Sequence, residues 1–551
     1  MNNSSYLNAN LLDLPTQITV YDGNNNQIAQ TVNTYDGSTP VGSGVTQHHN
    51  IPTATTRGNL TLSQKWLNTT GGLVQASSTS YYDTGMPYLS YDLFNRSTQF
   101  TYSSANYGSY VTQTTYPTTG STTHAVSGTY DFNTGLLTQF TDQNGQSSSY
   151  GYDLLGRILS GSYPDTGSVS VAYTDTIPVQ IQKTVKVTGS LNKVTNSVFD
   201  GLGRPSQMQA HDPDCTTGSA LVKVDYGYGY DTSQFTRYAT TTTPYCDQPG
   251  TLYGLPIRTD SDVLGRAVKL TQSDGAIATT SYSQNTTTVT DEAGITRKSQ
   301  MDGLGRMTTV WEDPNGKNYE TDYVYNGLDN LTTVTQKGDG SGNRVRTFGY
   351  DSLSRLTSAT NPETGTISYA YSNSPSGCAG LPSIVCSKST PKPATTTYAY
   401  DALNRLAQKS YNDGTAAVKV GYDGVVPSGC SPVPPSLTDS YPKPLRTAMC
   451  DASGATAWSH DTMGRALSEM RTLNSATKTT SYTYNYDGSL KKLTYPGSAR
   501  VITYAQNGSS SYTSGRPASA IESTGINYVT GATYAPFGGM TGMTNGSTGS
   551  F

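Results

Sequence analysis

A short motif recurs along this chain, and its repetition constrains the fold more than any other feature of the sequence. Its clearest form is Tyr152-Asp153-Leu154-Leu155-Gly156-Arg157, and eight clear copies lie between residues 91 and 465. The recurring positions are Asp92 and Arg96; Asp153, Gly156 and Arg157; Asp200, Gly203 and Arg204; Asp262, Gly265 and Arg266; Asp302, Gly305 and Arg306; Asp351 and Arg355; Asp401 and Arg405; and Asp461, Gly464 and Arg465. This repetition predicts a repeat architecture, in which each unit buries its core only against its neighbours.

The motif has the composition of a β-hairpin turn. An Asp at the first turn position can accept hydrogen bonds from backbone N–H groups two residues further on. The Gly position then requires a positive φ, because a type I turn closed by a left-handed residue is a common hairpin connection. Asn95 and Asn404 replace Gly in two copies, and Asn tolerates this conformation next best. Ser354 is the exception, and we expect mild strain or a shifted turn there.

The segments around each turn have the pattern of β-strands. Upstream of the Asp, aromatic residues alternate with small or polar ones, as in Tyr150-Gly151-Tyr152 and Tyr398-Ala399-Tyr400, which is the period of a strand. Downstream of the Arg, apolar or Thr positions such as Ile158-Leu159 fit the return strand of a hairpin. The sequence therefore predicts an all-β fold of serial antiparallel hairpins in one continuous sheet, with almost no helix.

The pattern resembles the RHS or YD-repeat family of bacterial and animal proteins, whose repeat reads roughly Tyr-Asp-x-x-Gly-Arg-Leu with a Pro and a Gly later in the unit. Asn361-Pro362-Glu363-Thr364-Gly365-Thr366 and Tyr163-Pro164-Asp165-Thr166-Gly167 supply this later Pro and Gly. The resemblance covers roughly residues 80 to 540. It implies a sheet that spirals, either as an RHS/YD shell or as an open β-strip.

In RHS-type toxins the core ends in Asp-Pro-x-Gly-Leu, a motif associated with aspartyl self-cleavage ahead of a variable toxin domain. Asp212-Pro213-Asp214 and Asp313-Pro314-Asn315 lack the following Gly-Leu, so neither inherits that role.

Three segments are expected along the chain. Residues 1–80 hold turn-like pieces without the full motif and are interpreted as degenerate N-terminal repeats or a cap. Residues 81–540 are the repeat array, with Cys- and Pro-rich insertions at 374–394 and 425–449 that we expect to be loops. Residues 541–551 are a Gly/Ser/Thr-rich tail, interpreted as the end of a truncated array. The start has no basic or apolar leader pattern, so either a signal was removed, export uses another route, or the chain is a fragment.

The charge and cysteine content restrict the partners and the compartment. Net charge is −4 with no Lys/Arg run, which disfavours nucleic acid and anionic membranes as partners. No run of eighteen apolar residues occurs, so no membrane span is expected. The six cysteines fall in three close sets, and proximity favours these disulfide pairs over the other connectivities: Cys215 with Cys246, Cys378 with Cys386, and Cys430 with Cys450. Disulfides indicate an oxidising compartment, hence a secreted or cell-surface protein.

The sequence carries no pattern of catalysis. Nucleophile-elbow, zinc and phosphate-loop motifs are absent, and the histidines do not cluster with the cysteines. The Asp and Arg of the motif recur in every copy, whereas a catalytic pair is needed once. We therefore expect no enzymatic activity, no cofactor and no metal.

Two functions remain open. By resemblance, the chain is the shell portion of an exported RHS protein that encloses or presents a polypeptide cargo. The alternative is a surface adhesion, carbohydrate-binding or self-assembling structural protein, which uses its Tyr/Thr faces to bind glycans, partner cells or other copies of the same chain.

Overall fold

The structure is a computed structural model that describes residues 4–46, 56–216, 219–247, 253–338, 342–371, 378, 381–392, 394–497, 500–508 and 511–546. Within these ranges the helical elements are α1 (Ser4–Asn8) and the 3-10 turn η1 (Ser104–Asn106), and neither has the length or apolar character to cross a membrane. The described ladders between strands are antiparallel. The predicted all-β class of serial antiparallel hairpins is confirmed.

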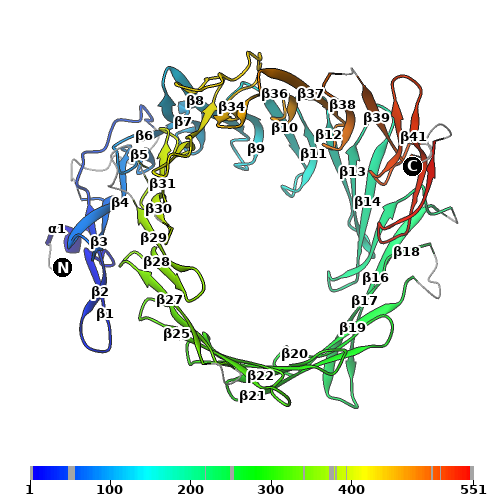
Figure 1. The fold of residues 1–551 in the computed structure, drawn as a ribbon, viewed down its shortest axis with the longest axis horizontal. Coiled ribbons are helices and arrows are strands. Elements are labelled where there is room, and N and C mark those ends of the chain that lie inside the picture. The colour runs from blue at the N-terminus through cyan, green and yellow to red at the C-terminus, as the bar shows by residue number, and fades with distance from the viewer. Residues whose placement is uncertain are drawn as a thin grey trace. The chain divides into compact units, whose positions relative to one another are not determined.

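Contacts divide the chain into two compact units, and each unit combines separate stretches of sequence. Unit 1 consists of Met1–Ser147, Thr321–Ser459 and Arg471–Thr477. Unit 2 consists of Ser148–Glu320, His460–Met470 and Lys478–Phe551. In both units the strands of each stretch follow one another in chain order as successive hairpins (Figure 1), with one exception in unit 2.

The strands that lie wholly or mostly in unit 1 are β1 (Gln17–Tyr21), β2 (Gln27–Tyr35), β3 (Leu60–Leu67), β4 (Gly72–Tyr81), β5 (Pro87–Tyr91), β6 (Ser97–Tyr102), β7 (Val111–Thr119), β8 (Thr122–Tyr130), β9 (Leu137–Thr141), β25 (Tyr319–Tyr325), β26 (Leu331–Gln336), β27 (Arg344–Tyr350), β28 (Leu356–Asn361), β29 (Gly365–Tyr371), β30 (Val385–Ser389), β31 (Thr395–Tyr400), β32 (Leu406–Tyr411), β33 (Val418–Tyr422), β34 (Arg446–Asp451) and β35 (Gly454–His460).

Those of unit 2 are β10 (Ser147–Tyr152), β11 (Ile158–Ser162), β12 (Ser168–Thr174), β13 (Val179–Lys186), β14 (Asn192–Phe199), β15 (Pro205–His211), β16 (Leu221–Asp231), β17 (Thr236–Thr242), β18 (Tyr245–Cys246), β19 (Pro256–Ser261), β20 (Ala267–Thr271), β21 (Ile277–Ser283), β22 (Thr286–Thr290), β23 (Thr296–Met301), β24 (Met307–Glu312), β36 (Ala466–Leu473), β37 (Ala476–Tyr484), β38 (Leu490–Thr494), β39 (Val501–Gln506), β40 (Pro517–Glu522), β41 (Asn527–Tyr534) and β42 (Met540–Asn545). The exception to the chain order is β18, which pairs with β16 and leaves β17 to pair with β19.

The register shifts by one residue at the position directly before most of the motif turns. In the β10–β11 hairpin, Gly151 lies opposite Ser160, but Tyr152 lies opposite Ile158. The same shift occurs before the turns of Asp200, Asp262, Asp351 and Asp401. A left-handed residue that closes a type I turn produces this bulge, and the bulge increases the local twist of the strands.

The two main stretches of each unit meet through their hairpin turns. In unit 1, the Ser352 hydroxyl donates to the Trp66 carbonyl at 2.6 Å, across 286 residues of sequence. In unit 2, the Arg465 guanidinium donates to the Asp165 carboxylate at 2.9 Å, across 300 residues. Hydrogen bonds between turns therefore join the stretches within each unit.

Two Cys- and Pro-rich segments were expected to be loops. Residues 425–445 do form a loop between β33 and β34, which begins at Arg446. The other expectation is wrong in part, because β30 lies within 374–394 and pairs with both β29 and β31. Cys386 on β30 is fully buried, which favours a strand over an exposed loop. Residues 374–377, 379, 380 and 393 of that segment, and 547–551 of the tail, lie outside the described residues.

Candidate functional site: clasped turns and a buried polar network

Each motif turn is closed by three hydrogen bonds to its Asp carboxylate. Asp153 Oδ1 accepts from the backbone N–H groups of Leu155 and Arg157, both at 2.9 Å, and Oδ2 accepts from Arg157 Nε at 2.7 Å. The other seven copies have the same three bonds. In Asp262, hydrogen bonds from the Arg266 side chain and backbone hold the pKa below its ordinary value. The motif is thus a self-contained clasp of Asp and Arg.

The residue before the Arg is left-handed in all eight copies. Its φ is 75–80° in Gly156, Gly203, Gly265, Gly305 and Gly464, and 59–60° in Asn95, Asn404 and Ser354. The Ser354 N–H donates to the Asp351 carbonyl at 3.0 Å, the same bond that Gly156 makes with Asp153. Of the two alternatives expected for Ser354, the shifted turn is wrong and the strained turn is observed, since Ser adopts the left-handed conformation in place.

Replacing Gly265 with Ala should lower the free energy of unfolding by about 1 to 2 kcal/mol, and replacing it with Asn by less. Gly265 has φ 80°, and an added Cβ would meet no atom within 4 Å, so backbone strain is the only source of the cost. Thermal melts of wild type, Gly265→Ala and Gly265→Asn measure the order. An Ala variant as stable as wild type would contradict the turn assignment.

The motif Arg also stacks on a Tyr of the next hairpin, a contact that the repeat motif by itself does not predict. The Arg157 guanidinium carbon lies 4.1 Å from the Tyr173 ring centre, and the Tyr173 hydroxyl donates to the Ile158 carbonyl at 3.1 Å. The same pair of contacts joins Arg266 to Tyr282, Arg355 to Tyr371 and Arg405 to Tyr422. Three of these pairs are sixteen residues apart, a spacing that could have revealed them. Cation–π contacts thus couple successive hairpins.

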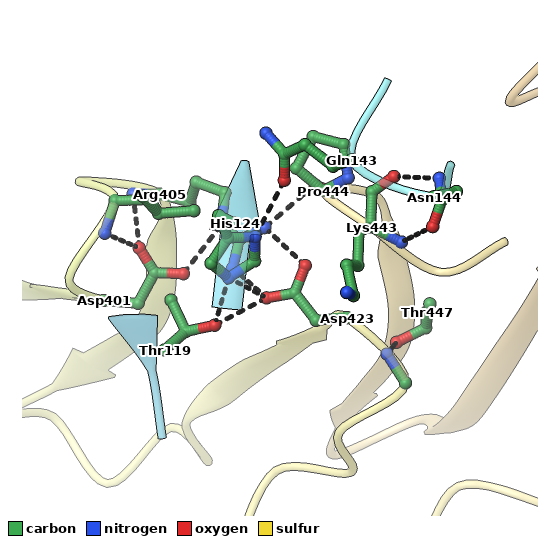
Figure 2. Close-up of polar contacts among 12 residues, drawn as sticks. Thr119, His124, Gln143, Asn144, Asp401, Arg405, Asp423, Lys443, Pro444 and Thr447 are labelled. Atoms are coloured by element: carbon green, nitrogen blue, oxygen red, sulfur yellow. Dashed lines mark hydrogen bonds and ion pairs between the residues drawn. The ribbon is translucent and has the colours of Figure 1, made fainter. Parts of the chain in front are cut away.

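In unit 1 one clasp extends into a buried polar network (Figure 2). Arg405 Nε donates to Asp401 at 2.7 Å, while its two terminal nitrogens donate to the Asp423 carboxylate at 3.0 and 2.5 Å. Thr119 Oγ1, from the end of β7, donates to Asp423 Oδ2 at 2.8 Å. The side chain of Asp423 is 1% exposed.

His124 of β8 completes the network (Figure 2). Its side chain is 0% exposed, and both ring nitrogens have partners: Nε2 lies 2.7 Å from Thr119 Oγ1, and Nδ1 lies 2.8 Å from Gln143 Oε1. Nε2 is also 3.5 Å from Asp423 Oδ2. Both nitrogens of this buried imidazole thus have hydrogen-bond partners, as buried polar groups in folded proteins generally do.

Hydrogen bonds to the backbone of Lys443 and Pro444 lie next to this network. Arg405 donates to the Pro444 carbonyl at 2.9 Å, and the Lys443 N–H donates to Asn144 Oδ1 at 2.9 Å. The Asn144 side-chain amide donates in return to the Lys443 carbonyl. The network therefore ties the β7–β9 hairpins to the turns at 401–405 and 423–445.

The geometry suits a clasp and not a catalyst. In a nucleophile–histidine–acid relay the acid contacts the imidazole nitrogen that faces away from the hydroxyl. Here Asp423 contacts the hydroxyl itself and lies on the Nε2 side, while Gln143 occupies Nδ1. With His124 and Asp423 both buried, no reactant can reach them.

The network should make unit 1 sensitive to acid. Burial alone would raise the pKa of Asp423, but hydrogen bonds from Arg405 and Thr119 and the nearby positive charge outweigh it, so the pKa lies below its ordinary value. A carboxyl of lowered pKa stabilises the fold above its unfolded-state pKa, about 3.9, and this contribution is lost as the pH falls through the lower folded-state value. We therefore expect the melting temperature to decrease as the pH is lowered from about pH 4. Asp423→Asn should remove part of that slope, and an unchanged slope would contradict the role of Asp423.

Three disulfides join the cysteine pairs that proximity favoured: Cys215 with Cys246, Cys378 with Cys386, and Cys430 with Cys450. Among the described residues, no group of three or more His, Cys, Asp or Glu side chains is arranged to hold a metal ion.

Fold and site together define a hairpin-repeat protein whose Asp–Arg turns are structural clasps. Solved structures share this fold. The chain superposes on a TcdB2-TccC3-Cdc42 structure with TM-score 0.72 and 12% identity over 94% of its length, and on a TcdB2-TccC3 structure with TM-score 0.71 and 13% identity over 95%. For the Tc holotoxin pore of Photorhabdus luminescens the values are 0.67, 12% and 94%.

This chain spans about a third of the length of each of those chains, 33%, 32% and 33% respectively. No family model matches the sequence. No curated protein matches it either.

Proposed function

We propose that this chain is a non-enzymatic shell segment of an exported RHS/YD-repeat protein, and that it encloses or presents a polypeptide cargo carried in a longer chain. The observation that carries the proposal is the likeness of fold to the TcdB2-TccC3 chains over 94% of this chain. The eight motif turns, which resemble the RHS/YD repeat, support it. In this proposal residues 81–540 are the array, 1–80 degenerate repeats or a cap, and 541–551 the tail.

The chemistry of the described residues supports a scaffold. The motif carboxylates and guanidiniums are engaged with one another in each turn, and several motif arginines also stack on a tyrosine. The hydroxyls of those tyrosines donate to backbone carbonyls, which favours a structural role over sugar stacking. Three disulfides support a secreted or cell-surface location.

The experiment is protease protection of a cargo. An unstructured reporter polypeptide is fused after Phe551, and its digestion is compared with that of the same reporter fused to an unrelated β-protein. A shell segment should slow the digestion of its reporter and leave the comparison fusion unprotected. Equal digestion rates together with specific binding on a glycan array would overturn the proposal in favour of a carbohydrate-binding surface protein.

A further inference from the structure

The motif turns in the first stretch of unit 2 expose a row of large apolar side chains. These residues occupy the two central positions of the turns that begin at Asp153, Asp200, Asp262 and Asp302. Their exposed fractions run from 74 to 105%: Leu154, Leu155, Leu202, Val263, Leu264 and Leu304. Consecutive turns of an antiparallel meander alternate between its two edges, and these four turns lie on the same edge, which we call the motif edge.

The corresponding turns of unit 1 show what covers such an edge. In the turn at 351–355, Ser352 is buried: its hydroxyl donates to the Trp66 carbonyl at 2.6 Å and accepts from the Asn68 N–H at 3.0 Å. In the turn at 401–405, Leu403 is half-buried and shares a hollow with Leu93 and Pro117. Both turns therefore pack against hairpin turns of an earlier stretch.

In unit 2 a motif turn likewise contacts a turn of an earlier stretch, here through a charged hydrogen bond. Arg465 of the motif turn at 461–465 donates to the Asp165 carboxylate in the turn Tyr163-Pro164-Asp165-Thr166-Gly167. That turn lies on the edge opposite the motif edge of its own stretch. The exposed motif edge offers the same donors, since the side chains of Arg204 and Arg266 are 46% and 45% exposed beside their own Asp partners.

The chain also carries exposed turns with the same residue pattern as the Asp165 turn, which contacts Arg465. Asn361-Pro362-Glu363-Thr364-Gly365 repeats the Pro-acid-Thr-Gly pattern of the Asp165 turn, follows the motif turn at 351–355 on the opposite edge, and leaves the Glu363 side chain 50% exposed. Asp274 is exposed in a similar turn of unit 2. One molecule therefore exposes both the apolar, Arg-bearing motif edge and the acidic turns that could pack against it.

We propose that the motif edge of unit 2 is a docking surface for the opposite turn edge of a second copy of this chain. The apolar turn residues would pack against the Pro and Gly turns of that copy, and Arg204 and Arg266 would donate to its acidic turn residues. Because the two edges differ, the contact is head-to-tail, and copies that associate in this way form open assemblies rather than closed pairs. The proposal goes beyond the shell function and needs no cargo.

Sedimentation velocity of the purified chain over a range of concentrations tests this surface. The wild type should form species heavier than the 58.6 kDa monomer. In Leu155→Asp/Leu264→Asp, each charge should raise the dissociation constant by roughly tenfold or more. Met208→Asp is the matched control, because Met208 is 44% exposed at the middle of β15, away from both turn edges. It should associate as wild type does.

Mixing separates a head-to-tail contact from a symmetric one. The double variant keeps its opposite edge, so an excess of it should cap wild-type assemblies and shrink them to pairs. Glu363→Lys, which keeps the motif edge intact, should also weaken self-association. A wild type that stays monomeric at all concentrations, a double variant that associates as strongly as wild type, or a double variant that does not join wild type would each overturn the proposal.

Discussion

Replacing Arg405 with Ala is expected to lower the free energy of unfolding of unit 1 by about 3 to 5 kcal/mol, because it leaves a buried carboxylate without its cation. The Asp423 side chain is 1% exposed and accepts two hydrogen bonds from Arg405. The same replacement at Arg204 should cost at most about 1 kcal/mol, as for other exposed ion pairs. Arg204 occupies the same motif position, but its side chain is 46% exposed and its partner Asp200 is 26% exposed.

The comparison needs both variants in one experiment. Thermal unfolding followed by near-ultraviolet circular dichroism and by calorimetry should show a much larger shift for Arg405→Ala than for Arg204→Ala. Arg405→Lys should fall between wild type and Ala, because Lys restores the charge but lacks the planar guanidinium that bonds Asp401 through Nε and Asp423 through both terminal nitrogens. Equal losses at positions 405 and 204 would show that the buried network adds nothing to the local clasp.

The clasp at Arg204 was accessible from sequence because all of its parts lie within five residues. Asp200 and the left-handed Gly203 define the turn by local chemistry alone, and the aromatic alternation upstream defines the strand. Eight copies in one chain reinforce a signal that would be weak in a single copy. The all-β class and the hairpin order follow from such local rules.

The network at Arg405 was not accessible, because its members come from distant parts of the chain. Thr119 and Asp423 are 304 residues apart, and nothing local marks His124 as a partner for either. Asp423 stands in a degraded copy, Tyr422-Asp423-Gly424, and takes part in the network through the neighbouring hairpin's Arg405 rather than through an Arg of its own. The alignment of one stretch on another depends on the twist accumulated over many strands, which no short pattern encodes.

The turns themselves show how the same motif serves two environments. Where a second stretch packs on the turn, as at Ser352, a central turn residue is buried and hydrogen-bonded across the contact. Where no described segment covers it, as at Leu264, the motif keeps the same internal bonds and exposes its apolar residues. The motif thus determines the turn, whereas its surroundings determine whether the turn also joins stretches.

Removing the Cys215–Cys246 disulfide by double replacement with Ala should cost about 3.7 kcal/mol, and removing Cys430–Cys450 about 3.3 kcal/mol, if chain entropy alone decides. The bonded residues are 31 and 20 positions apart respectively. The Cys430–Cys450 bond also spans the loop that carries Lys443 and Pro444, whose backbone groups contact Asn144 and Arg405. Removing Cys430–Cys450 should therefore cost more than the entropic value. We expect it to cost more than removing Cys215–Cys246, the reverse of the order that loop length predicts.

A double-mutant cycle distinguishes this coupling from simple loop closure. Combining the Cys430/Cys450 replacement with Arg405→Ala should cost less than the sum of the separate losses, because both changes release the same loop. Combining Arg405→Ala with the Cys215/Cys246 replacement should be additive within about 0.5 kcal/mol, since that bond lies in unit 2. Calorimetric melts of the wild type and the five variants provide every corner of the two cycles. Additivity in both cycles would mean that the loop and the buried network are energetically independent, in spite of the hydrogen bonds that join them.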